Sequence, residues 1–111
     1  MSQQEFLSFF HKLLHYINDR LDEHAISDNI EADVSNEVLT ITIDDCKTFV
    51  INKQCSLKEI WVSSPFTGPY HFKLDTDSNL WKDSSNNELF SLITHEIGVT
   101  FNYREFLSMI E

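Results

Sequence analysis

The sequence predicts an α+β fold, a two-layer α/β sandwich in which two terminal helices pack on one face of a five- to six-stranded antiparallel sheet. Apolar residues recur at three- and four-residue steps near both ends of the chain, as in amphipathic helices. Between these ends, apolar and polar residues alternate in several short segments, as in strands with one buried face. Short connections between these segments favour antiparallel hairpins. A length of 111 residues suits one core, so we expect a single domain over residues 1–111.

The first helix is expected over residues 2–24, where Ser2 and Glu5 have the spacing of a capping box. Acidic side chains gather at its C-terminal end, although the helix dipole favours cations there. Asp19 and Glu23 lie four residues apart, and like charges at this spacing cost roughly 0.2–0.5 kcal/mol. Helix stability therefore does not explain why acidic side chains gather at this end of the helix. The buried stripe is expected to consist of Phe6, Phe10, Leu13, Leu14, Ile17 and Leu21.

The sheet is expected over residues 29–83. Its first strand, NIEADVS, alternates so that Glu31 and Asp33 point outward. The remaining strands are expected in EVLTITID, TFVINKQ, EIWVSS, YHFKLD and NLWKD.

The outer face of this sheet is predicted to carry an unusual set of side chains. Asn52 and Gln54 fall on it, and Trp61 joins them because Ile60 and Val62 point inward. With both helices on the core face, the other face is open to water or to a partner. A tryptophan flanked by amides suits partner contact, because it offers a large apolar area and orienting hydrogen bonds. The alternative is that the loop SPFTGP covers Trp61.

The second helix is expected over residues 86–97. Ser85 and Glu88 repeat the capping-box spacing, and Gly98 is a natural stop. The tail, residues 99–111, is too apolar for a free end, so we expect a short turn of helix packed back on the domain.

The charge balance limits the classes of partner. Eighteen acids against eight bases give a net charge of −10, which disfavours nucleic acids and anionic membranes. Residues 1–33 alone contain seven acids and two bases. Such a surface favours cations or a basic protein partner.

Two absences guide the expected location. No apolar run approaches the roughly 18 residues of a membrane span. The N-terminus, MSQQEFLSFF, lacks the basic start and the small-residue cleavage site of a signal peptide. We therefore predict a soluble, cytoplasmic protein.

Cys46 and Cys55 belong to no CxxC pair, so ordinary reduced thiols are expected.

An enzyme is not expected. Gly68 and Gly98 are the only glycines in the sequence, so there is no glycine-rich phosphate loop, and no nucleophile elbow is present. Paired acids could serve a hydrolase, but no pair is expected in a closed pocket.

The order of elements and several ordered motifs resemble the frataxin family, including the bacterial CyaY proteins. The resemblance covers Phe6 to Ile97, with DRLDE ending the first helix and EVLTITI in the second strand. Two departures are Ser56, where the family usually has proline, and Glu59, where it usually has glutamine. Asn18 stands where a relative carries another acid. The family pattern of Asn-x-Gln, then Trp, then Gly before an aromatic strand is matched by Asn52, Gln54, Trp61, Gly68 and Phe72.

The resemblance implies an iron-binding modulator of iron–sulfur cluster assembly, which acts on the cysteine desulfurase and its scaffold protein, with iron delivery as a companion role. It implies weak binding of ferrous or ferric iron, or of other divalent cations, on an acidic ridge formed by the first helix and first strand. Partner contact is expected at Asn52, Gln54 and Trp61. A monomer is expected, and iron-driven oligomers remain open. The metal-binding residues are expected to be Asp19, Asp22, Glu23, Glu31, Asp33 and His15.

Less specific interpretations of the same residues remain open. Exposed carboxylates are hard donors that suit iron, but they also form an ordinary solvated helix face. His15 lies one turn before Asp19, where an imidazole would improve affinity for borderline metals, yet His11 and His15 are equally consistent with two surface histidines. The competing function is a metal-independent acidic protein-interaction module.

Overall fold

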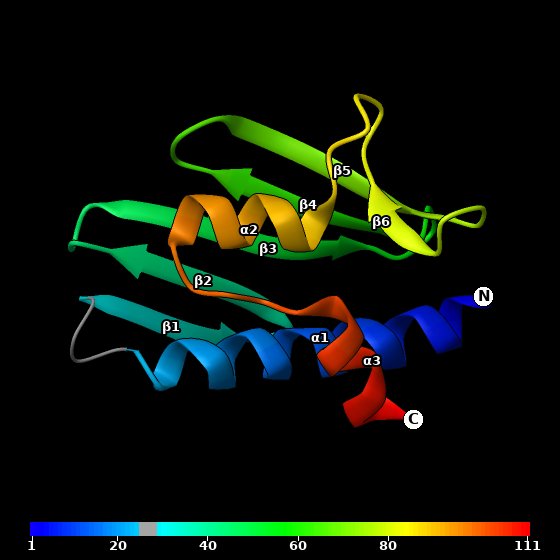
Figure 1. Cartoon of the computed structure of the whole chain (residues 1–111), viewed down its shortest axis with the longest axis horizontal. Coiled ribbons are helices and arrows are strands. Elements are labelled where there is room, and N and C mark those ends of the chain that lie inside the picture. The colour runs from blue at the N-terminus through cyan, green and yellow to red at the C-terminus, as the bar shows by residue number, and fades with distance from the viewer. Residues whose placement is uncertain (25–28) are drawn as a thin grey trace.

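The computed structural model describes residues 1–24 and 29–111 as three helices and six strands (Figure 1). In chain order these are α1 (Gln3–Asp22), β1 (Ile30–Ser35), β2 (Val38–Ile43), β3 (Lys47–Gln54), β4 (Glu59–Ser64), β5 (Gly68–Asp75), β6 (Leu80–Lys82), α2 (Leu89–Ile97) and α3 (Tyr103–Ile110).

The six strands form one antiparallel meander in the order β1-β2-β3-β4-β5-β6. Its first hairpin is closed by Asn36 and Glu37, both with positive φ (53° and 60°), as the right-handed twist of a two-residue hairpin requires. This turn fixes the register in which Glu31 pairs with Thr42 and Asp33 pairs with Thr40. The acids of β1 therefore point away from the core, as the alternation predicted.

All three helices lie on one face of the sheet, toward the viewer in Figure 1. Helix α1 runs alongside β1 and β2, and α2 crosses in front of the middle strands. The predicted two-layer sandwich is thus confirmed, with a third helix added to the helical layer. The inward side chains of the sheet are fully buried against these helices, namely Leu39, Ile41, Phe49, Ile51, Ile60, Val62 and Phe72.

The ends of the first two helices show how local chemistry sets their bounds. Ser2 Oγ accepts from Glu5 N at 3.0 Å and Glu5 Oε1 accepts from Ser2 N at 2.9 Å, which is the predicted capping box. Helix α2 starts later than expected, with Glu88 rather than Ser85 as its N-cap. The cause is Asp83, whose carboxylate accepts from the backbone N–H groups of Ser85 and Asn87 and keeps this segment in a turn.

The C-terminal segment is a full helix anchored on α1, where only a short turn was expected. The Tyr16 hydroxyl accepts from Asn102 N at 3.0 Å and donates to Asn102 O at 3.3 Å. Arg20 donates to Thr100 O from Nε at 3.3 Å and from Nη2 at 3.1 Å. Phe106 is buried, with its ring centre 5.3 Å from that of Tyr16. These contacts close the helical layer beside α1.

Candidate functional site

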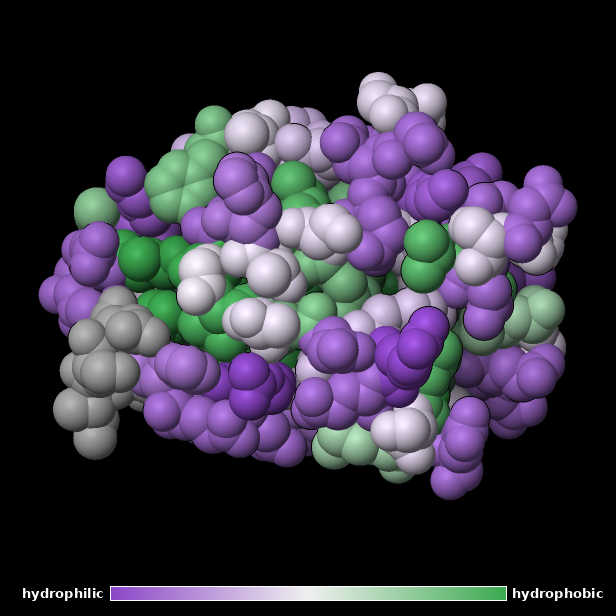
Figure 2. Space-filling view, viewed as in Figure 1, coloured by the Kyte–Doolittle hydropathy of each residue, from purple (hydrophilic) through white to green (hydrophobic). Residues whose placement is uncertain are grey.

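Five carboxylates that the sequence assigned to metal binding lie at one side of the molecule. Asp19 and Asp22 come from the last turn of α1, Glu23 is its C-cap, and Glu31 and Asp33 come from β1. All five are exposed. The side of the molecule along which α1 runs is strongly hydrophilic (Figure 2).

Three of these acids line one hollow. Asp22, Glu31 and Asp33 line a shallow hollow of about 420 Å³ at the junction of α1 with the β1 edge of the sheet, which we call the acidic hollow. Thr40 and Thr42 of β2, the cross-strand partners of the two β1 acids, complete its polar wall. Carboxylate and hydroxyl oxygens are hard donors that suit iron and other divalent cations.

The other two acids are placed differently. Glu23 Oε2 is 2.9 Å from Arg20 Nη1, and the same guanidinium holds Thr100 O, so Glu23 belongs partly to the anchor of the C-terminal segment. Asp19 is exposed and does not line the acidic hollow. The predicted ridge is therefore one charged side of the molecule, but its members do not form one cluster.

The described part of the chain does not form a tight metal site. Within residues 1–24 and 29–111, no three His, Cys, Asp or Glu side chains come close enough together to hold an ion. A tight site would show converging ligands supported by a second layer of hydrogen bonds. His15 is also exposed, and its ring lies against His11, with ring centres 4.5 Å apart and planes at 72°.

The second candidate surface is the outer face of the sheet around Trp61. Trp61 is half-buried and lies between Asn52 of β3 and His71 of β5 in the strand register. Its ring stacks on His71 with centres 4.1 Å apart and planes at 12°. Its Nε1–H donates to Glu59 Oε1 at 2.9 Å. The side chain therefore faces outward, as predicted, and is held in one orientation.

Glu59 is the residue that sequence reasoning missed, having noted it only as a departure from the family pattern. Its side chain is covered by its neighbours, with 7% of the residue exposed, and Lys73 Nζ lies 3.3 Å from Oε2. The hydrogen bond from the Trp61 indole lowers the pKa of Glu59, outweighing the opposing effect of burial, and Lys73 adds to the lowering. Burial opposes ionisation only modestly because Glu59, though covered, lies near the molecular surface. The two-residue spacing places Glu59 beside Trp61 on one face, but the hydrogen bond between them also depends on the side-chain rotamers.

The two amides flank this arrangement without touching the indole nitrogen. Asn52 is exposed, and its Oδ1 accepts from Lys53 N at 2.8 Å. Gln54 is half-buried and pairs with Glu59 across the strands. The sheet register therefore brings both amides next to the Trp61 surface.

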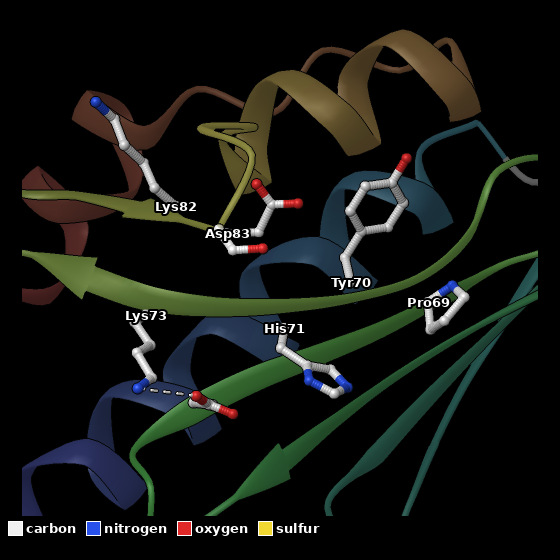
Figure 3. A pocket seen from close by; sticks show the side chains of 8 residues that line it. Pro69, Tyr70, His71, Lys73, Lys82 and Asp83 are labelled. Atoms are coloured by element: carbon white, nitrogen blue, oxygen red, sulfur yellow. Dashed lines mark ion pairs between the residues drawn. The ribbon is translucent and has the colours of Figure 1, made fainter.

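Two hollows adjoin Trp61. One of about 200 Å³ is lined by Trp61 itself with Asn52 and His71, among others. The other, of about 510 Å³, is lined by Glu59, His71 and Lys73 and extends to the β6 side of the sheet. Figure 3 shows the ion pair that Lys73 makes in this second hollow.

The loop SPFTGP does not cover Trp61. Ser64 Oγ donates to Glu96 Oε1 at 2.5 Å and Thr67 Oγ1 donates to Glu96 Oε2 at 2.7 Å, which ties the loop to α2. Phe66 packs on Phe49 of the core face, with ring centres 5.7 Å apart. Residues 64–67 are thus directed to the helical side of the sheet, whereas Pro69, at the end of the loop, lines the hollow beside Trp61 on the other side.

Comparison with known proteins shows clear relatives. Residues 1–103 match the sequence profile of the frataxin-like domain. Mitochondrial frataxin of Arabidopsis thaliana is 35% identical over an alignment of 79 residues, which covers 65% of this chain and 42% of that protein. Mitochondrial frataxin of Dictyostelium discoideum is 34% identical over 84 residues, 75% of this chain and 44% of that protein. The chain thus spans less than half the length of these two relatives.

Solved structures share the fold. Frataxin from Psychromonas ingrahamii, of the CyaY protein family, superposes with a TM-score of 0.77 over 92% of this chain and 99% of that chain, at 20% identity. Trimeric frataxin from the yeast Saccharomyces cerevisiae, complexed with ferrous iron, is 30% identical with a TM-score of 0.71, over 81% of this chain and 82% of that chain.

The predicted cytoplasmic location is contradicted, because both curated relatives are mitochondrial frataxins. The prediction was based on the absence of a signal-peptide pattern in residues 1–10. The residues that determine the fold carry no information about the cellular compartment. No helix in the described part of the chain is long and apolar enough to cross a bilayer.

The profile match over residues 1–103, the two relatives at 34% and 35% identity, and the shared antiparallel sheet with its helical layer show that this chain belongs to the frataxin-like family.

Proposed function

We propose that this chain is an iron-binding modulator of iron–sulfur cluster assembly, which acts on the complex of a cysteine desulfurase and its scaffold protein, with iron delivery as a companion role. Family membership and the yeast relative complexed with ferrous iron support the proposal. The observation that carries it is the presence, on one small domain, of an acidic hollow and a separate outward-facing tryptophan surface.

Iron would be bound at the acidic hollow as cargo. Asp22, Glu31 and Asp33 offer oxygen donors from two elements, and the net charge of −10 draws cations toward them. At an exposed site the effective dielectric constant is high, so the attraction between the carboxylates and the ion is small. Binding is therefore weak and poorly selective. Asp19 and Glu23 add to the negative electrostatic field, and His15 lies one helical turn before Asp19.

The desulfurase complex would contact the outer sheet face. Trp61 supplies the apolar contact, and Asn52 and Gln54 supply hydrogen bonds beside it. Because Glu59 and His71 already hold the indole, little side-chain entropy is lost when a partner docks.

A ferrous iron titration under anaerobic conditions, followed by backbone amide resonances, tests the iron-binding part. We expect the largest changes at Asp22, Glu31 and Asp33, and a loss of those changes in the variant D22N/E31Q/D33N. The control variant D45N/D77N/E111Q removes the same formal charge from exposed acids elsewhere and should still respond. An unaltered iron response in D22N/E31Q/D33N would refute the acidic hollow as the iron site.

The second candidate is a metal-independent acidic interaction module, favoured by the lack of converging ligands in the described residues. It predicts the same desulfurase binding with and without iron and no localised iron response.

Iron-driven oligomers belong to the first proposal, since the yeast relative with ferrous iron is trimeric. Sedimentation velocity with and without ferrous iron would detect them.

A further inference from the structure

Two histidines form a close pair on the exposed side of α1. His11 and His15 are four residues apart, and side chains at this spacing are neighbours on one helix face. Both residues are exposed, and their ring centres are 4.5 Å apart with planes at 72°. Neither residue lines the acidic hollow.

We propose that His11 and His15 together chelate one borderline divalent transition ion, of which Zn²⁺ is the reference case. Two imidazoles that bind one zinc ion tetrahedrally through nitrogens about 2.1 Å from it have ring centres roughly 5.3 Å apart. The observed ring centres are 4.5 Å apart, so a modest opening and rotation of the exposed rings would bring both nitrogens to the ion. Two histidines four residues apart on a helix supply zinc ligands in the HExxH arrangement as well.

Two acidic side chains adjoin the pair, and one of them is already paired with a lysine. Glu37, in the β1–β2 turn, lies near enough to His11 for their charges to interact. The Glu37 carboxylate is itself held by Lys53 at 2.8 Å. Asp19 follows His15 by one helical turn. Water would fill the remaining coordination positions, so the affinity is moderate.

The chemistry of the donors separates this pair from the acidic hollow. Imidazole nitrogen suits Zn²⁺, Ni²⁺ and Cu²⁺, whereas carboxylate oxygens suit harder ions. Helix α1 therefore contributes to two cation-binding surfaces of different preference. The His11–His15 site stands whether or not the acidic hollow binds iron, so the two proposals fail independently.

Calorimetric titration of the full chain with ZnCl₂ in the presence of excess Mg²⁺ tests the proposal. We expect one Zn²⁺ per chain, with the affinity lowered by about tenfold or more in each of H11Q and H15Q, because either change leaves a single imidazole. H95Q, which changes an exposed histidine of α2, should bind like the wild type. D22N/E31Q/D33N should keep the Zn²⁺ site, which separates it from the acidic hollow.

Side-chain histidine resonances give a readout that does not depend on variants. The His11 and His15 signals should shift together at the same Zn²⁺ concentration, with the His95 signal unmoved. Equal Zn²⁺ affinity in wild type, H11Q and H15Q would overturn the proposal. So would loss of the Zn²⁺ site in D22N/E31Q/D33N with the histidine resonances unmoved in the wild type.

Discussion

At the scale of single residues, Trp61 can occupy a water-facing sheet surface because its neighbours stabilise it there. The ring stacks on His71, and the indole N–H donates to Glu59, which Lys73 holds from its other oxygen. A tryptophan fixed in this way keeps its polar atom bonded while exposing an apolar surface. These properties support the proposed role of Trp61 as an interface anchor.

The hydrogen bond from Trp61 to Glu59 can be tested with a pair of substitutions. Glu59→Leu removes the acceptor and should lower the free energy of unfolding by about 1–2 kcal/mol. Glu59→Gln keeps an acceptor oxygen and should cost less than about 1 kcal/mol. Urea unfolding followed by tryptophan fluorescence measures both. Equal losses in the two variants would assign the stabilisation to the charge of Glu59 and its ion pair with Lys73.

The pH dependence of the same site follows from the lowered pKa of Glu59. A carboxyl group whose pKa is lower in the folded than in the unfolded state stabilises the fold above its unfolded pKa, near 4.5. That contribution is lost as pH falls through the lower, folded pKa. The stability advantage of wild type over Glu59→Gln should therefore be constant from pH 7 to about 5 and shrink below about pH 4. An advantage that grows on acidification would contradict this assignment.

The sequence predicted the face of Trp61 but not what holds it. Alternation with Ile60 and Val62 determines the face, because both are fully buried. The bond to Glu59 depends on side-chain rotamers, and its link to Lys73 depends on the β4–β5 register. Neither can be read from one strand alone.

At the scale of elements, α3 shows how packing produces a helix that sequence pattern does not define. It has eight residues, too few for a stable isolated helix. Asn102 caps it by accepting from Glu105 N at 2.9 Å, and the Tyr16 hydroxyl fixes the Asn102 backbone. Phe106 anchors it, in edge contact with Phe9 at 5.4 Å between ring centres. Helix α3 is therefore stabilised mainly by α1.

Truncating that anchor should cost far more than truncating a neighbour on the same helix. Phe106→Ala removes a fully buried aromatic ring and should lower the free energy of unfolding by about 3–5 kcal/mol. Met109→Ala, at a residue that is 64% exposed, should change it by less than about 0.5 kcal/mol. Denaturant unfolding compares the two. A small effect of Phe106→Ala would mean that α3 is not part of the cooperative fold.

Most elements were predictable because their pattern is periodic over several turns or strand pairs. Helix α1 and the six strands came out close to their expected ranges for this reason. The start of α2 was misplaced because Ser85 and Glu88 have capping-box spacing. In the structure the backbone N–H groups of Ser85 and Asn87 donate to Asp83 instead, which keeps this segment out of the helix. Competing local hydrogen bonds of this kind do not alter the spacing of apolar residues, so the apolar periodicity does not reveal them.

At the scale of the whole molecule, the charge distribution opposes folding and favours binding. Asp22, Glu31 and Asp33 lie around one hollow, and none of the described residues that line it is basic. Clustered like charges repel, and a bound cation or a basic partner relieves that repulsion. The sequence predicted the acidic side of the molecule. It could not show that Arg20, bonded to the C-terminal segment, pairs with Glu23.

This division of the acids predicts opposite effects on stability. D22N/E31Q/D33N should leave the free energy of unfolding unchanged or raise it by up to about 1 kcal/mol, because it relieves repulsion. Glu23→Gln should lower it by about 0–1 kcal/mol, because it breaks an exposed ion pair. Urea unfolding at low ionic strength measures both. A marked loss of stability in D22N/E31Q/D33N would show that these acids have a structural role.

We further propose that the negative charge of the acidic hollow, when free of iron, attracts the desulfurase–scaffold complex over a long range, while the Trp61 surface makes the short-range contact. The kinetics of binding to that complex at several ionic strengths test this most directly. We expect D22N/E31Q/D33N to associate more slowly and to lose most of the salt dependence of the association rate. Trp61→Ala should keep that salt dependence and dissociate faster, by about 2 kcal/mol or more in binding free energy. Phe66→Ala, which truncates an exposed aromatic ring on the helical side, should bind like the wild type. Normal binding of Trp61→Ala, or its failure to fold, would contradict the account.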